Sequence, residues 1–170
     1  MSEATIPAAP LKQSIHSVAN VFVLVGQNVL LYQHIETYLK LLLPHMARTD
    51  GETSSDAFLE IKSLLESKST MGPLVEQLKQ SIQSSHPEEF ASYVEAVVTN
   101  RNELTHGFLR LPFARLDNAA ACESAVQYLT SKHQFAFPLF QSLRLLLATF
   151  VELLDDPAQL LSTEDVPNFA

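Results

Sequence analysis

Apolar residues recur every three or four positions along most of this chain, which is the spacing of one face of an α-helix. No stretch shows the alternation of apolar and polar residues that is typical of a half-buried strand. We therefore predict an all-α fold, an up-and-down bundle of four to five helices. The expected helices cover residues 14–43, 56–68, 73–84, 87–107 and 118–154.

The same spacing predicts which side chains face inward. On the first helix these are Ile15, Val18, Phe22, Val25, Val29, Tyr32, Leu39 and Leu43. The two short helices offer Phe58, Ile61 and Leu65, and then Leu74, Val75, Leu78 and Ile82. The fourth helix offers Phe90, Val94, Val97, Leu104 and Phe108. The last helix offers Cys122, Val126, Leu129, His133, Ala136, Phe140, Leu143, Leu147, Phe150 and Leu154, with a kink expected at Pro138.

The length of 170 residues favours one domain. We expect a flexible N-terminus over 1–13, a single helical-bundle domain over 14–154 and a C-terminal tail over 155–170. The polar segment 44–55 contains Pro, Gly, Ser and Thr, which predicts a mobile linker after the first helix.

Composition and charge limit the classes of partner. A net charge of −8 opposes broad attraction to nucleic acid or to an anionic membrane. The single cysteine, Cys122, excludes an intrachain disulfide. The N-terminus has no apolar region of the kind found in secretory signals, and the longest apolar stretches, near 21–26 and 145–151, fall short of the ~20 residues that span a bilayer. The sequence thus predicts a cytoplasmic protein without a membrane partner.

Three polar residues interrupt the predicted inward faces: Glu36, Arg101 and His133. An unpaired buried charge costs several kcal/mol, so each needs a partner or a function. A lone histidine on an apolar face is usually a satisfied core residue, and we expect this of His133. For Glu36 and Arg101 two interpretations stay open: an internal ion pair that fixes the helix register, or a functional site.

Arg101 lies in an unusually polar segment, Asn100-Arg101-Asn102-Glu103-Leu104-Thr105-His106, at the end of the fourth helix. This segment resembles the Arg-x(4–6)-His signature of the HEPN superfamily (higher eukaryotes and prokaryotes nucleotide-binding domains). The segment 70–78 and the long first helix with Glu36 are also similar to bacterial members. The resemblance covers about residues 14–150. It implies a homodimer in which two copies of the motif face one cleft, with metal-independent endoribonuclease activity in a toxin–antitoxin or defence setting.

The chemistry of RNA cleavage fits these residue types. Attack by the 2′-hydroxyl needs one group to accept a proton and another to donate one, and histidine titrates near neutral pH. His106 is the expected acid–base residue and Arg101 the expected phosphate ligand, with Asn102 orienting the imidazole. Positions 101 and 106 lie about 140° apart around an ideal α-helix, so a second copy is needed to complete the site.

The supporting residues are less specific. Glu36 is expected to support the site, and Arg110 and Arg115 to bind substrate. The window 101–115 holds three arginines and one glutamate, a net charge of +2, which leaves −10 for the rest of the chain. Phe108 stands where some family members carry a nucleotide-accepting tyrosine, so neutralisation by nucleotide transfer is doubtful.

Other chemistries fit the sequence less well. Glu103-x-x-His106 matches half of a di-iron site, but no other histidine has an acid three residues before it, and the histidines lack zinc spacing. We expect no metal and no other cofactor. The main alternative is a non-catalytic module similar to mannitol-repressor-like helical proteins, which binds nucleotide or protein and regulates transcription or assembly. The expected partners are a second copy, RNA, and an antitoxin or regulatory protein.

Overall fold

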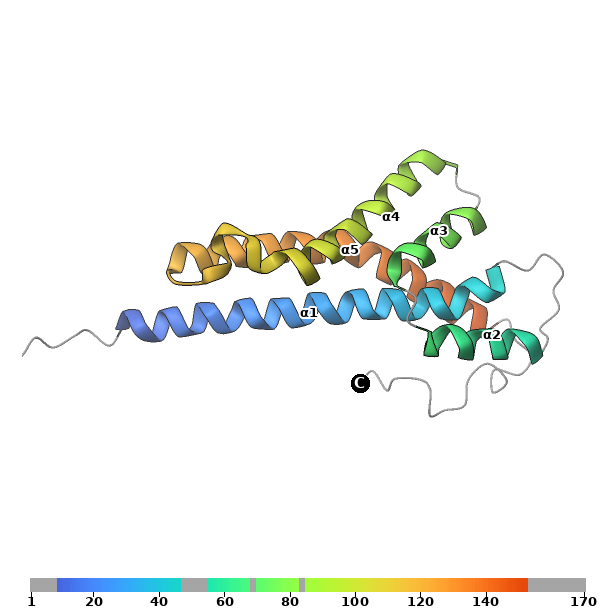
Figure 1. Ribbon diagram of the computed structural model, residues 1–170, viewed down its shortest axis with the longest axis horizontal. Coiled ribbons are helices and arrows are strands. Elements are labelled where there is room, and N and C mark those ends of the chain that lie inside the picture. The colour runs from blue at the N-terminus through green and yellow to red at the C-terminus, as the bar shows by residue number, and fades with distance from the viewer. Residues whose placement is uncertain (1–8, 47–54, 68–69, 83–84, 153–170) are drawn as a thin grey trace, which may run out of the picture. The chain divides into compact units, whose positions relative to one another are not determined.

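The computed structural model describes residues 9–46, 55–67, 70–82 and 85–152 (Figure 1). Across these residues the chain forms helices and no strand, which confirms the all-α prediction. The five α-helices are α1 (Ala9–Met46), α2 (Ser55–Glu66), α3 (Met71–Ser81), α4 (Pro87–Asn102) and α5 (Ala119–Glu152). Between α4 and α5 lie a π-turn, η1 (Glu103–Gly107), and two 3₁₀ turns, η2 (Phe108–Arg110) and η3 (Pro112–Arg115).

The helix boundaries follow local chemistry. α4 begins with Pro87 and carries two acids in its first turn, as predicted, where the helix dipole favours negative charge. α5 begins after Asn118, whose Oδ1 accepts a hydrogen bond of 2.8 Å from the backbone N–H of Ala121, a side-chain N-cap. α1 begins at Ala9, earlier than predicted, and runs through Pro44 to Met46. The prediction of a linker over 44–55 is wrong at its ends, because 44–46 belong to α1 and Ser55 begins α2. The remainder of that linker, the predicted tail over 155–170, and the side chains of Ile15, Phe58 and Leu154 lie outside the described residues.

The helices group into two compact units. Within the described residues, the first unit contains 9–32 and 99–136, and we call it the motif unit. The second contains 33–98 and 137–152, and we call it the α2–α3 unit. α1 and α5 each contribute to both units. The prediction of a single domain over 14–154 stays a prediction.

The α2–α3 unit has an aliphatic core with one largely buried ion pair. Its fully buried large side chains are Ile35, Leu39, Leu42, Met71, Leu74, Val75, Leu78, Val94 and Val97. Lys40 is 7% exposed, and its Nζ lies 3.3 Å from Glu36 Oε1 and donates to Ser67 O at 3.2 Å. Glu36 therefore pairs within its own helix, one turn from Lys40.

The motif unit has a smaller core between α1, η1 and α5. Its buried residues are Val21, Asn28, Leu31, Tyr32, Leu104, Cys122, Ala125, Leu129 and Ala136. Burial of Leu104 and Cys122 was predicted from the sequence and is confirmed. Asn28 is fully buried, and its Nδ2 donates to Leu24 O at 2.9 Å and to Leu129 O at 3.1 Å. Asn28 thereby joins α1 to α5 by a side-chain hydrogen bond.

The predicted inward face of α1 is wrong at Phe22. Its side chain is 65% exposed, and the neighbouring Val21 is buried instead. Val23 and Leu30 are also largely exposed. Between 17 and 33 the helix carries no Asp, Glu, Lys or Arg, so apolar residues lie on both of its sides. The spacing of apolar residues is therefore compatible with burial of either side. The structure buries the side that contains Asn28 and leaves Phe22 outside.

Two helices are long and apolar enough to cross a membrane by length and composition, over Ser17–Met46 and Ala119–Glu152, and the most apolar 18-residue window of each has a mean hydropathy of 1.3. Uninterrupted apolar runs in the sequence do not reveal them, because Ser, Asn, Gln and Thr break those runs. Less than a third of the most apolar window in either helix is buried. The core helix of a soluble protein passes the same test of length and composition. Both helices therefore expose apolar surface, and the absence of a membrane partner stays a prediction.

Candidate functional site: the π-turn motif and its apolar hollow

The polar motif spans the point where α4 changes into a π-turn. Arg101 and Asn102 are the last residues of α4, and Glu103–Gly107 form η1. Thr105 contributes to this change, because its Oγ1 donates to the carbonyl oxygen of Arg101 at 2.9 Å. Such a bond competes with the regular helical pattern. A π-helix closes hydrogen bonds between residues i and i+5, and here it contains His106, while Arg101 lies in the last turn of α4.

Arg101 and Asn102 are joined directly. Arg101 is half-buried, and its Nη1 donates to Asn102 Oδ1 at 3.1 Å. The side-chain oxygen of Asn102 thus contacts the guanidinium of Arg101. The predicted role of Asn102 in orienting the imidazole stays a prediction. His106 is exposed. The motif therefore presents a positioned guanidinium at the end of α4 and an accessible imidazole in η1.

Glu103 is held by α5. Its Oε2 accepts hydrogen bonds from Lys132 Nζ at 2.7 Å and from the Tyr128 hydroxyl at 3.3 Å, and Lys132 also donates to Asn100. The hydrogen bond from Lys132 lowers the pKa of Glu103 below its ordinary value. Burial, together with the nearby Glu103 carboxylate, raises the pKa of Tyr128 to about 12. Glu103 is therefore an ionised side chain that anchors the motif to α5.

An aromatic cluster fixes the chain after the motif. The ring centroids of Phe113 and Tyr128 lie 5.4 Å apart, and Phe108 lies 6.3 Å from Phe113 and 6.4 Å from Tyr128. Lys132 Nζ also lies 5.1 Å from the centre of the Tyr128 ring. Phe108 thus packs against α5 and η3, which gives this position a structural role. The sequence did not point to Tyr128 or Lys132, because they join the motif across about 25 residues of chain and no local spacing signals that contact.

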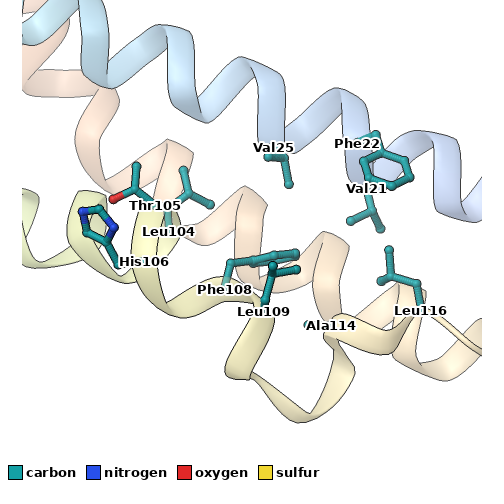
Figure 2. Close-up of a pocket in the computed structure, with 10 residues that line it drawn as sticks. All are labelled: Val21, Phe22, Val25, Leu104, Thr105, His106, Phe108, Leu109, Ala114 and Leu116. Atoms are coloured by element: carbon teal, nitrogen blue, oxygen red, sulfur yellow. The ribbon is translucent and has the colours of Figure 1, made fainter.

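His106 borders an apolar hollow of about 320 Å³ in the motif unit (Figure 2). The side chains of α1 lie along one wall, and residues from η1 to Leu116 form the other. Figure 2 shows His106 and Thr105 at one end of the hollow and Phe22 and Leu116 at the other. The lining consists of Val21, Phe22, Val25, Leu104, Thr105, His106, Phe108, Leu109, Ala114 and Leu116.

The remaining candidate residues lie in different places. Arg110 and Arg115 are exposed at the ends of η2 and η3, in the same unit as His106. Glu36 belongs to the α2–α3 unit and pairs with Lys40, so its predicted support of the site stays a prediction. His133 is half-buried on α5.

Within the part of the chain that the structure describes, no three His, Cys, Asp or Glu side chains gather so as to hold a metal ion. Comparison with protein-family models, with curated proteins and with solved structures gives no match to this chain.

Proposed function

We propose that the chain is a metal-independent endoribonuclease that acts as a homodimer in the cytoplasm. The observation that supports this most directly is that Asn102 holds the half-buried Arg101 guanidinium, Lys132 holds the Glu103 carboxylate, and the His106 imidazole is exposed five residues after Arg101. A guanidinium that binds a phosphate and an imidazole that moves a proton are the two groups that cleavage through the 2′-hydroxyl requires.

The reaction needs one proton acceptor and one proton donor. The imidazole of one His106 takes the proton of the 2′-hydroxyl, and the 2′-oxygen then bonds to phosphorus. The bond from phosphorus to the 5′-oxygen breaks, and an imidazolium donates a proton to that oxygen, which leaves a 2′,3′-cyclic phosphate and a 5′-hydroxyl. Arg101 stabilises the charge on the non-bridging oxygens. Because each chain carries one such histidine, a second copy supplies the donor.

The test is incubation of the purified full chain with total RNA in EDTA. Wild type should give RNA fragments that end in 2′,3′-cyclic phosphate, and His106→Ala or Arg101→Ala should give none. His86→Ala is a matched control, because His86 is also exposed but lies in the other unit. Circular dichroism shows whether each variant folds. Cleavage that persists in both motif variants refutes the assignment.

A non-catalytic regulatory module is the second candidate. The observation that favours it is apolar exposure beside the motif, since Phe22 is 65% and Leu109 is 86% exposed, and exposed apolar patches mark contacts with other proteins. A folded wild type that cleaves no RNA under these conditions would favour this candidate.

A further inference from the structure

The hollow beside His106 has the chemistry of a peptide-docking groove. Eight of its ten lining residues are aliphatic or aromatic, and its volume of about 320 Å³ lies at the lower end of the ~300–1,000 Å³ found for ligand pockets. It therefore has room for one or two apolar side chains rather than for a large cofactor. Two of the lining residues, Phe22 and Leu109, project far into solvent, so an occupant would contact them from outside as well.

The stretches of chain that line the hollow carry charge of one sign, and the acids Glu103, which pairs with Lys132, and Asp117 lie just outside them. The two stretches that line it, 17–33 and 104–116, contain two arginines and no aspartate or glutamate, while the whole chain carries −8. Arg110 and Arg115 are both exposed. They are the last residues of η2 and η3, which lie in the 104–116 segment. Neither arginine lines the hollow itself, but each directly follows or precedes a lining residue, Leu109, Ala114 or Leu116. An apolar hollow in a stretch whose exposed charges are arginines is complementary to an amphipathic segment whose polar side is acidic.

We infer that this hollow docks an acidic amphipathic segment of a partner protein. An apolar side chain of that segment enters between α1 and the 104–116 wall, and its carboxylates pair with Arg110 and Arg115. Because His106 forms one end of the hollow, the bound segment covers the imidazole. The inference rests on the proposed function only for its consequence, which is that docking inhibits cleavage. Recognition itself depends on the hollow and its two arginines.

Three labelled helical peptides test this recognition by fluorescence anisotropy with the full chain. The first places Leu and Phe at helical spacing with glutamates beside them. The second replaces the glutamates with lysines, and the third replaces Leu and Phe with serines. We expect the first peptide to bind at least tenfold more tightly than either of the others. Equal binding of all three overturns the inference.

Matched variants locate the contact. Phe22→Ala should weaken binding of the acidic peptide about tenfold or more, whereas Val23→Ala should not, because Val23 is 57% exposed but does not line the hollow. Replacing Arg110 and Arg115 together with alanine should remove the preference for glutamate over lysine. Arg144→Ala is the charge control, since Arg144 is exposed in the other unit. A preference that survives the double variant overturns the inference.

Two other occupants give distinct results. If a second copy fills the hollow, the acidic peptide or Phe22→Ala will convert a dimer into a monomer in sedimentation velocity. If an RNA base fills the hollow, Phe22→Ala will weaken the binding of a single-stranded oligonucleotide as much as it weakens the binding of the peptide. Either result overturns the inference. If the chain binds the acidic peptide but cleaves no RNA, the docking site is supported and the proposed nuclease activity is refuted. If the chain cleaves RNA but shows no preference among the peptides, the nuclease activity is supported and the docking site is refuted.

Discussion

Asn28 offers the sharpest test of the packing in the motif unit, because its two polar atoms have opposite energetic effects. Its Nδ2 makes two hydrogen bonds, to Leu24 O and Leu129 O, each contributing about 0.5–1.5 kcal/mol net. Its Oδ1 is buried without a hydrogen-bond partner among the described residues, which costs about 1–3 kcal/mol. The two effects nearly cancel, so Asn28→Leu, which keeps the branched shape, should change the free energy of unfolding by no more than about 1 kcal/mol.

Asn28→Asp should behave very differently at the same position. A carboxylate would place negative charge against the carbonyl oxygens of Leu24 and Leu129 and would lose both hydrogen bonds. The expected loss at neutral pH is at least about 3 kcal/mol, because the buried charge has no partner. The same environment raises the pKa of the new carboxyl above its unfolded value. The deficit relative to wild type should therefore be smallest below about pH 4 and grow as the pH rises through the folded pKa.

Urea unfolding of both variants measures these differences in the free energy of unfolding, provided that the slope of this free energy against urea concentration is the same as in wild type. Gln27→Asp is the control, since Gln27 is exposed on the same helix and its change should stay within about 0.5 kcal/mol. The reasoning fails if Asn28→Leu costs as much as Asn28→Asp, because the amide would then contribute far more than two ordinary hydrogen bonds. It also fails if the aspartate is tolerated at neutral pH.

Three further predictions concern the first turn of α5 and the anchor of the motif. Asn118→Ala removes the acceptor for the Ala121 N–H and should destabilise the chain by about 1 kcal/mol in thermal unfolding, whereas Asn118→Ser should retain most of the stability. In an ultraviolet titration, Glu103→Gln should move the pKa of Tyr128 from about 12 part of the way toward its ordinary value, because burial, the largest cause, remains; an unchanged value contradicts the contact. Lys132→Met should reduce stability at neutral pH, and its difference from wild type should shrink as the pH falls below 4.5, because protonation of Glu103 removes the interaction that lowers its pKa in the folded state.

The sequence predicted most of the helices because their signals are local. The inward face of α5 is confirmed at every described position, with Cys122, Leu129, Ala136 and Leu143 fully or nearly buried and none of the others exposed. The start of α4 at Pro87 is also confirmed. These features depend on residues within a few turns of one another, so apolar spacing and first-turn chemistry were sufficient to predict them.

The features of the site that the sequence did not predict depend on contacts between distant segments. The π-turn forms where Thr105 binds the Arg101 carbonyl and where Lys132 and Tyr128 hold Glu103, which no spacing within 100–106 reveals. An ion pair between Glu36 and Arg101 was one of two open interpretations, because both residues interrupt an apolar face. Glu36 pairs with Lys40 one helical turn away, a short-range alternative that the sequence already contained.

The exposed side chain of Phe22, which the sequence predicted to face inward, bears most directly on function. A helix segment without charge over 17–33 has apolar side chains on every side, and such a segment is either enclosed by its own fold or covered by something else. Here α1 buries Val21 and Asn28 and leaves Phe22, Val23 and Leu30 largely exposed, so the described residues do not enclose it. Turning the helix to bury Phe22 would expose Val21 and would break the hydrogen bond from Asn28 to α5. The face that buries Val21 and Asn28 therefore leaves Phe22 outward. Phe22 also lines the hollow that His106 borders, so the segment that we propose to dock there would contact this exposed part of α1.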